Sequence, residues 1–168
     1  MLEAAARFIE TRSRSVAEVR RRLTGAGYRT DLVEGALARL LEIGILDDEV
    51  FARLWIESRD RAHPRGEAAL RRELRLKGVE PAVIDVVVAE RAGERDAAQD
   101  GPSDGAPTAD STAADRLLAR SARTLARVAD SRTRRQRAWA LLARHGFDPE
   151  TASDAVRRFL AEAESEGD

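Results

Sequence analysis

The sequence contains no cysteine among its 168 residues, and aromatic side chains make up only 4% of it. Without cysteine the chain has neither disulfide bonds nor zinc–thiolate sites, which is compatible with a reducing cytosol, so we expect a cytoplasmic protein. No apolar stretch approaches the roughly 18 residues of a membrane span, and the first residues show no signal-peptide pattern, so we expect no membrane partner. The formal net charge of −1 gives no global excess that would indicate nucleic acid.

Patterns that carry catalysis or metal binding are missing as well. The sequence has no H-E-x-x-H, P-loop or G-x-G-x-x-G motif and only two histidines. His63 lies in a Pro-Gly loop, and His145 lies at the end of a predicted helix, where the helix dipole favours a positive side chain. The acidic run at residues 47–49 is explained by helix capping, with Asp47 or Asp48 as the N-cap. We therefore expect no enzyme, no cofactor and no metal.

The chain is rich in alanine, leucine, arginine and glutamate, a composition typical of an all-helical protein. The segment Ala68–Val88 shows the pattern: apolar residues at helical spacing, then Gly78 as a left-handed helix stop, then Pro81 at the start of the next helix. An earlier helix opens with a capping box of Ser15 and Glu18. The helix that follows Gly44 is predicted to turn four side chains toward a core, those of Val50, Phe51, Leu54 and Trp55.

The same hairpin occurs three times when the chain is aligned on Gly27, Gly78 and Gly146. One apolar residue follows each glycine, and a leucine stands four residues before it. Further apolar positions recur ten residues after each glycine, at Leu37, Val88 and Val156. Another amphipathic helix precedes each hairpin, so the sequence predicts an all-α fold, an elongated tandem array of three three-helix units. Their predicted bounds are residues 1–45, 46–95 and 114–164.

An insertion separates the third unit from the second. Gly27 and Gly78 are 51 residues apart, whereas Gly78 and Gly146 are 68 residues apart. The additional residues fall in a stretch that is rich in Gly, Asp, Ser, Ala and Pro and has no apolar periodicity. We therefore predict a flexible linker at residues 96–113. Residues 165–168 are predicted to form a disordered tail.

Basic residues are unevenly spread along this near-neutral chain. The segment Arg61–Lys77 has six basic residues against two acidic ones, and Arg116–Arg144 has nine arginines against Asp130 alone. Such segments form basic surfaces suited to phosphates or to an acidic protein groove, although helical arginines also simply solvate an exposed face. The candidate residues for binding a filament or DNA are Arg20, Arg21, Arg22, Arg61, Arg65, Arg71, Arg72, Arg75, Lys77, Arg132, Arg134, Arg135 and Arg137.

A helix–turn–helix interpretation would make the second helix of each hairpin a DNA-recognition helix. Such a helix should present polar and basic side chains to base edges. The first two of these helices, DLVEGALARLLEI and AVIDVVVAER, are instead apolar, with acidic residues near their N-terminal ends. This argues against reading of the major groove and favours the arginines of the preceding helices as a surface that follows a backbone.

Three runs of the sequence together resemble the RecX family, the regulatory proteins of the RecA recombinase. They are RSRSVAEVRRRLTGAGY, LLEIGILDDEVFARLWIESR and PRGEAALRRELRLKGVEPAVI, and they match the family's patterns in order and spacing over about Arg12–Val88. A weaker match at Arg137–Phe147 extends the resemblance nearly to the end of the chain. Three tandem three-helix units are also characteristic of that family.

The resemblance implies a regulatory function without catalysis. Proteins similar to this one bind the RecA–single-stranded DNA filament, lie in its helical groove, and inhibit its ATPase, strand-exchange and co-protease activities. The chain would then act as a cytoplasmic monomer in homologous recombination, DNA repair and the SOS response. Its partners would be the RecA filament and, through weak direct binding, single-stranded DNA. The alternative is a stand-alone helix–turn–helix-like DNA-binding regulator.

Overall fold

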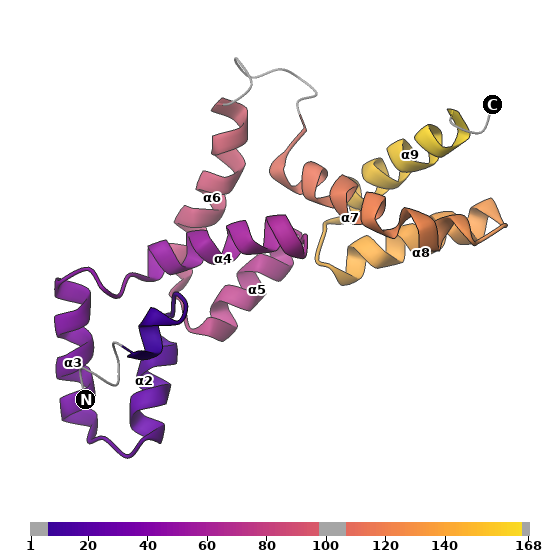
Figure 1. Cartoon of the computed structure of the whole chain (residues 1–168). Coiled ribbons are helices and arrows are strands. Elements are labelled where there is room, and N and C mark those ends of the chain that lie inside the picture. The colour runs from indigo at the N-terminus through magenta and orange to yellow at the C-terminus, as the bar shows by residue number, and fades with distance from the viewer. Residues whose placement is uncertain (1–6, 98–106, 166–168) are drawn as a thin grey trace. The chain divides into compact units, whose positions relative to one another are not determined.

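The computed structural model describes residues 7–97 and 107–165, and within these ranges the chain forms helices and turns but no strand. The prediction of an all-helical fold is confirmed (Figure 1). A helical turn at residues 7–10 precedes the numbered helices. These are α2 (Val16–Gly25), α3 (Thr30–Glu42), α4 (Asp48–Ala62), α5 (Glu67–Lys77), α6 (Pro81–Ala97), α7 (Ala109–Ala126), α8 (Ser131–Arg144) and α9 (Pro149–Ser165).

The chain forms two compact units. One holds Met1–Glu57 and Arg72–Val87, and the other holds Ser58–Arg71 and Val88–Asp168. The division passes through α4, α5 and α6, so the helices of the predicted middle repeat contribute to both units. The predicted boundaries of the three repeats therefore stay a prediction.

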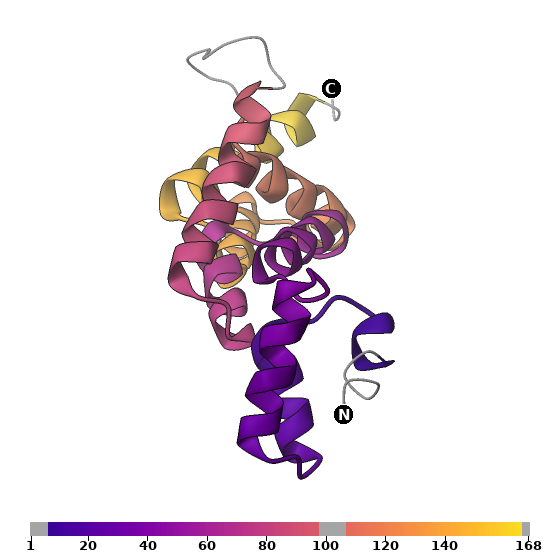
Figure 2. The ribbon, with the colours of Figure 1, turned by 90° about the vertical axis from the view of Figure 1, so that its left-hand side faces the viewer.

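The first unit is organised around the pair α2 and α3, which lie side by side and antiparallel (Figures 1 and 2). The predicted capping box at the start of α2 is present: the Ser15 side chain accepts from the Glu18 backbone N–H, and the Glu18 carboxylate accepts from the Ser15 N–H. Apolar side chains at helical spacing then meet between the two helices because both present one apolar stripe. The buried residues of this cluster are Val19, Leu23, Val33, Leu37, Leu40 and Leu46.

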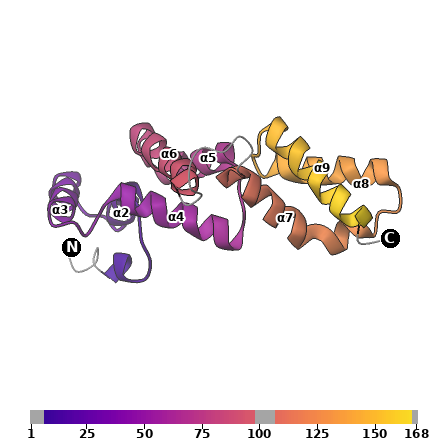
Figure 3. The same cartoon turned by 90° about the horizontal axis from the view of Figure 1, so that it is seen from above.

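The second unit contains α7, α8 and α9, which pack against one another (Figure 3). Their shared core consists of small and branched apolar side chains. Alanines are numerous in it, and they let the helix backbones approach closely. The core residues are Ala113, Ala114, Leu117, Leu118, Leu125, Ala138, Leu142, Phe147, Ala152, Ala155, Val156 and Leu160.

The three aligned glycines end their helices in the same way. Gly27, Gly78 and Gly146 have φ angles of 85°, 82° and 83°, in the left-handed region that glycine adopts without a steric penalty. In each turn the next backbone N–H donates to the carbonyl of the leucine five residues earlier, over 3.3, 3.1 and 3.3 Å respectively. These leucines are buried, as the sequence predicted, and the hairpin turns are confirmed.

Two sequence-based expectations were wrong in part. In α4 the side chains of Val50 and Leu54 are each 46% exposed, because the buried stripe of this helix runs through Phe51 and Ile56. The predicted linker at 96–113 contains helix at both ends, since α6 continues to Ala97 and α7 begins at residue 109 behind a Thr108 cap. Residues 98–106 and 166–168, which include most of the predicted tail, lie outside the described residues.

Candidate partner-binding surface

Within the first unit, the start of α2 packs against the turn after α5. The hydroxyl of Ser15 donates to the carbonyl of Lys77 over 2.6 Å. A side chain added at Gly78 would overlap the Cβ of Ala17, so only glycine fits this close approach. The sequence left the N-cap of α4 open between two aspartates. Asp47 caps α4 itself, whereas Asp48 accepts from the Val16 N–H over 2.9 Å and so caps α2. We call this contact the first junction.

Lys77 is held inside the first junction. Its ammonium lies 2.9 Å from the Glu18 carboxylate and 4.7 Å from the centre of the Trp55 ring. Burial by itself raises the pKa of Glu18, but the hydrogen bonds from Lys77 and Ser15 and the charges of Lys77 and Arg12 lower that pKa overall. The Trp55 indole N–H in turn donates to Glu73 over 3.0 Å. Lys77 therefore stabilises the fold and is a poor candidate for binding a partner.

The second unit contains an equivalent contact between the start of α5 and the turn after α8, which we call the second junction. The Gly66 N–H donates to the carbonyl of His145 over 3.1 Å. A Cβ at Gly146 would come within 2.5 Å of the Ala69 Cβ. The Asp110 carboxylate accepts from the Glu67 N–H over 2.9 Å, as Asp48 does for α2.

The residue numbers make the two junctions equivalent. Ser15 precedes Gly27 by the same number of residues as Gly66 precedes Gly78. Lys77 and His145 in turn stand directly before Gly78 and Gly146. The internal alignment of the sequence thus contained a signal for the junctions, although it did not show that these positions touch.

His145 occupies the second junction as a neutral side chain. Its Nδ1 lies 2.7 Å from Nη1 of Arg65 and 3.3 Å from the carbonyl oxygen of Pro64. Because a guanidinium only donates, the shorter contact makes Nδ1 an acceptor and places the proton on Nε2. Burial lowers the pKa of His145, and the charges of Arg65 and Arg144 lower it further, against an opposing contribution from Pro64. His145 lies at the C-terminal end of α8, as the sequence predicted, and its contacts with Arg65 and Pro64 belong to the second junction.

A buried ion cluster links three helices of the second unit. The Arg91 side chain is only 9% exposed, and its guanidinium lies 2.9 Å from the Asp60 carboxylate and 2.6 Å from the Asp110 carboxylate. Burial disfavours the charged form, but the two carboxylates outweigh it and raise the pKa of Arg91. Asp110 consequently serves both this cluster and the second junction.

The structure divides the thirteen predicted binding residues into two groups. Several have partners that neutralise or hold them. Arg20 pairs with Glu34 over 2.7 Å and Arg71 with Glu67 over 2.7 Å. Arg134 donates to the carbonyls of residues 128 and 129, and Arg22 lies 5.9 Å from the Phe8 ring centre. Arg61, Arg65 and Lys77 also have interactions within the chain.

The side chains of six of the predicted residues have no hydrogen bond, ion pair or ring contact with any other residue that the structure describes, and all six residues are exposed. Three belong to the first unit and three to α8 in the second unit. They are Arg21, Arg72, Arg75, Arg132, Arg135 and Arg137. A shallow cavity of about 280 Å³ is lined by Arg132 and Arg135 together with Ser131, Arg134 and Leu160.

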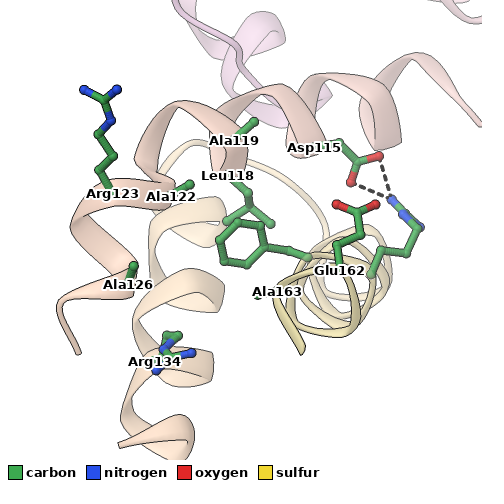
Figure 4. A pocket seen from close by; sticks show the side chains of 11 residues that line it. Asp115, Leu118, Ala119, Ala122, Arg123, Ala126, Arg134, Glu162 and Ala163 are labelled. Atoms are coloured by element: carbon green, nitrogen blue, oxygen red, sulfur yellow. Dashed lines mark hydrogen bonds and ion pairs between the residues drawn. The ribbon is translucent and has the colours of Figure 1, made fainter. Parts of the chain in front are cut away.

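A larger groove of about 510 Å³ lies between α7, α8 and α9 (Figure 4). Leu118 and Phe159 contribute apolar surface to it, and Ala119, Ala122, Ala126 and Ala163 widen it because their side chains are short. At one end the Arg158 guanidinium lies 2.9 Å from the Asp115 carboxylate. This groove is mainly apolar, and Arg134 is the one predicted binding residue that lines it.

Across residues 7–97 and 107–165, no three histidine or acidic side chains are grouped so as to hold a metal ion. None of the helices in these ranges is both long enough and apolar enough to cross a membrane.

The fold and the exposed arginines place this chain in a class of all-helical proteins that are built from three-helix units and present unpaired arginines on their surface. Family models of RecX match the chain twice: the first three-helix domain at residues 2–40 and the second three-helix domain at residues 47–87. The regulatory protein RecX of Streptomyces lividans is 36% identical over 147 residues, which cover 85% of this chain and 70% of that protein. The chain belongs to the RecX family.

Other relatives match over a shorter length. The regulatory protein RecX of Mycobacterium sp. (strain JLS) is 41% identical over 95 residues, and the match covers 55% of this chain and 52% of that protein. The chain thus spans about half the length of the mycobacterial relatives it matches. Among solved structures, RecX from Lactobacillus salivarius superposes with a TM-score of 0.74 over 94% of this chain and 93% of that chain, at 13% identity. At that identity the superposition shows a shared fold.

Proposed function

We propose that this chain binds the RecA–single-stranded DNA filament and inhibits its ATPase, strand-exchange and co-protease activities. The observation that carries the proposal is membership of the RecX family, whose curated relatives are named regulatory proteins. The chain acts as a cytoplasmic monomer in this proposal, and its partners are RecA and single-stranded DNA.

The arrangement of the basic residues suits such a partner. Unpaired arginines occur in both compact units, on α2 and α5 in one and on α8 in the other. A filament repeats the same surface along its length, so several modest contacts made by one chain combine through a high effective concentration. Each contact can then be weak while the whole interaction is strong.

The direct test measures RecA ATPase on single-stranded DNA while the chain is added from substoichiometric to equimolar amounts. We expect ATP hydrolysis to fall progressively, because each bound chain contacts more than one RecA subunit. An unchanged ATPase rate across this range would refute the proposed function.

A charge-reversal variant tests the assigned surface. The triple variant replaces three exposed arginines whose side chains have no partner with glutamate: Arg132→Glu, Arg135→Glu and Arg137→Glu. We expect the concentration for half-inhibition to rise by at least about tenfold, since exposed charge contacts contribute about 0.5–1 kcal/mol each. Arg134 is left unchanged because its backbone hydrogen bonds support the fold.

The matched control reverses three arginines that are exposed but already paired. Arg39, Arg53 and Arg157 pair with Glu42, Glu49 and Asp154 respectively. Their reversal changes the net charge by the same amount, so we expect half-inhibition within about twofold of the wild type. Equal losses in both variants would show that overall charge, rather than α8, governs binding.

A stand-alone DNA-binding regulator is the alternative. In α3 the first turn is acidic, and Asp31 pairs with Arg29 over 2.7 Å, which is unsuited to base edges. Tight, sequence-dependent binding of duplex DNA in a gel-shift assay without RecA would favour this alternative over filament binding.

A further inference from the structure

Helix α8 is unlike the other helices of the chain in its charge. It contains five arginines and no acidic residue, so no carboxylate on the helix itself compensates them. The helix contributes only Ala138 and Leu142 to the fully buried core. Arg134 supports the fold through its hydrogen bonds to the carbonyls of residues 128 and 129, but Arg132, Arg135 and Arg137 have no such role.

The same helix carries an exposed tryptophan. Trp139 is 40% exposed, and it is the one aromatic side chain among the exposed large apolar residues of the described ranges. Its indole N–H has no hydrogen-bond partner among the residues that the structure describes. The other tryptophan differs: Trp55 donates its N–H to Glu73, and its ring lies under Lys77.

Helix geometry places Trp139 among the unpaired arginines. At 100° per residue, Arg132, Gln136 and Trp139 fall within about 60° of one another around α8, and Arg135 lies about 40° from Trp139. All four of these residues are exposed to solvent, whereas Ala138 and Leu142 of the same helix are buried. An aromatic ring, two guanidinium groups and an amide thus share one solvent-facing surface.

We propose that this surface binds single-stranded nucleic acid, with the Trp139 ring stacked on an unpaired base and Arg132 and Arg135 bound to flanking phosphates. Every base has a π face, and a neighbouring arginine supplies the charge that a phosphate needs, so the pairing is independent of sequence. A duplex hides its base faces in the stack and is excluded. The inference rests on the proposed function and specifies that α8 contacts the DNA of the filament rather than RecA.

The test uses two substitutions at Trp139 and two oligonucleotides. Trp139→Leu keeps an apolar side chain but removes the π face, whereas Trp139→Phe keeps a ring that can stack. One labelled deoxythymidine oligonucleotide is intact, and the other carries abasic sites that retain the phosphates without the bases. Binding is measured by fluorescence anisotropy at a fixed low salt concentration, because phosphate contacts depend strongly on salt.

We expect Trp139→Leu to weaken binding of the intact strand by about 5- to 100-fold, the range found when a stacking aromatic is removed. Trp139→Phe should remain within about fivefold of the wild type. All three proteins should bind the abasic strand equally, because stacking contributes nothing there. Unchanged unfolding midpoints of both variants confirm that the effect is on binding.

Other outcomes overturn the inference without deciding the proposed function. If the wild-type chain binds neither oligonucleotide, or if Trp139→Leu binds the intact strand as well as the wild type, base stacking by Trp139 is refuted. RecA ATPase inhibition, measured separately with the same proteins, then shows whether the regulatory function survives. A loss of inhibition by Trp139→Leu with unchanged strand binding would assign this surface to RecA instead.

Discussion

Substitution of alanine for the turn glycines of the first unit tests how the first junction is held together. Gly27 and Gly78 have nearly the same φ angle, 85° and 82°, so alanine meets the same backbone penalty at both. That penalty is about 1–2 kcal/mol, partly offset because alanine also restricts the unfolded chain. The surroundings differ: a Cβ at Gly27 has nothing within 4 Å, whereas a Cβ at Gly78 overlaps the Cβ of Ala17.

The difference between the two variants therefore measures the junction alone. Gly27→Ala should lower the free energy of unfolding by about 1 kcal/mol. Gly78→Ala should lower it by about 1–3 kcal/mol more than Gly27→Ala does, which is the usual penalty for overpacking a tight contact. The measurement is urea unfolding followed by Trp55 fluorescence in a Trp139→Phe background, since Trp55 lies in the first unit and next to Lys77.

A second substitution completes the cycle. Ala17→Gly removes the methyl group that Gly78→Ala would strike, so the double variant should be more stable than the sum of the two single changes predicts, by about 1–2 kcal/mol. If Gly27→Ala and Gly78→Ala are equally destabilising, or if the double variant shows no coupling, close packing at Gly78 is not what the first junction requires.

Two further predictions concern the second unit. Burial lowers the pKa of His145 in the folded chain, so as the pH falls the unfolded chain takes up this proton at a higher pH than the folded chain does. The free energy of unfolding should therefore be constant above about pH 7 and fall below about pH 6.5, by at most about 1.4 kcal/mol per pH unit. His145→Gln should flatten this part of a plot of unfolding free energy against pH, and an identical slope in both proteins would contradict the assignment. Arg91→Met leaves Asp60 and Asp110 without their shared cation and should cost about 3–5 kcal/mol in urea unfolding. Arg158→Met, which breaks the exposed pair with Asp115, should cost less than about 1 kcal/mol, and similar losses in both variants would refute a special role for the buried cluster.

Local features were predicted well because short-range chemistry fixes them. The capping box at Ser15 and the left-handed turns at Gly27, Gly78 and Gly146 depend on neighbours within a few residues, and all are present. The same holds for the apolar stripes of the helices. Where such reasoning failed, the deciding contact was distant: Val50 and Leu54 fit an apolar pattern but lie outside the stripe that α4 buries.

The predicted binding residues show more clearly where prediction from the sequence ends. The sequence alone determined that basic side chains gather on the first helix of each hairpin, because helical periodicity places them there. Only the tertiary structure decided which of them are available, since the partners that engage Arg20, Lys77 and Arg65 lie 14, 59 and 80 residues away along the chain. A charge is neutralised by whatever lies within a few ångströms in space, and that distance is set by how the helices pack, not by the order of residues along the chain.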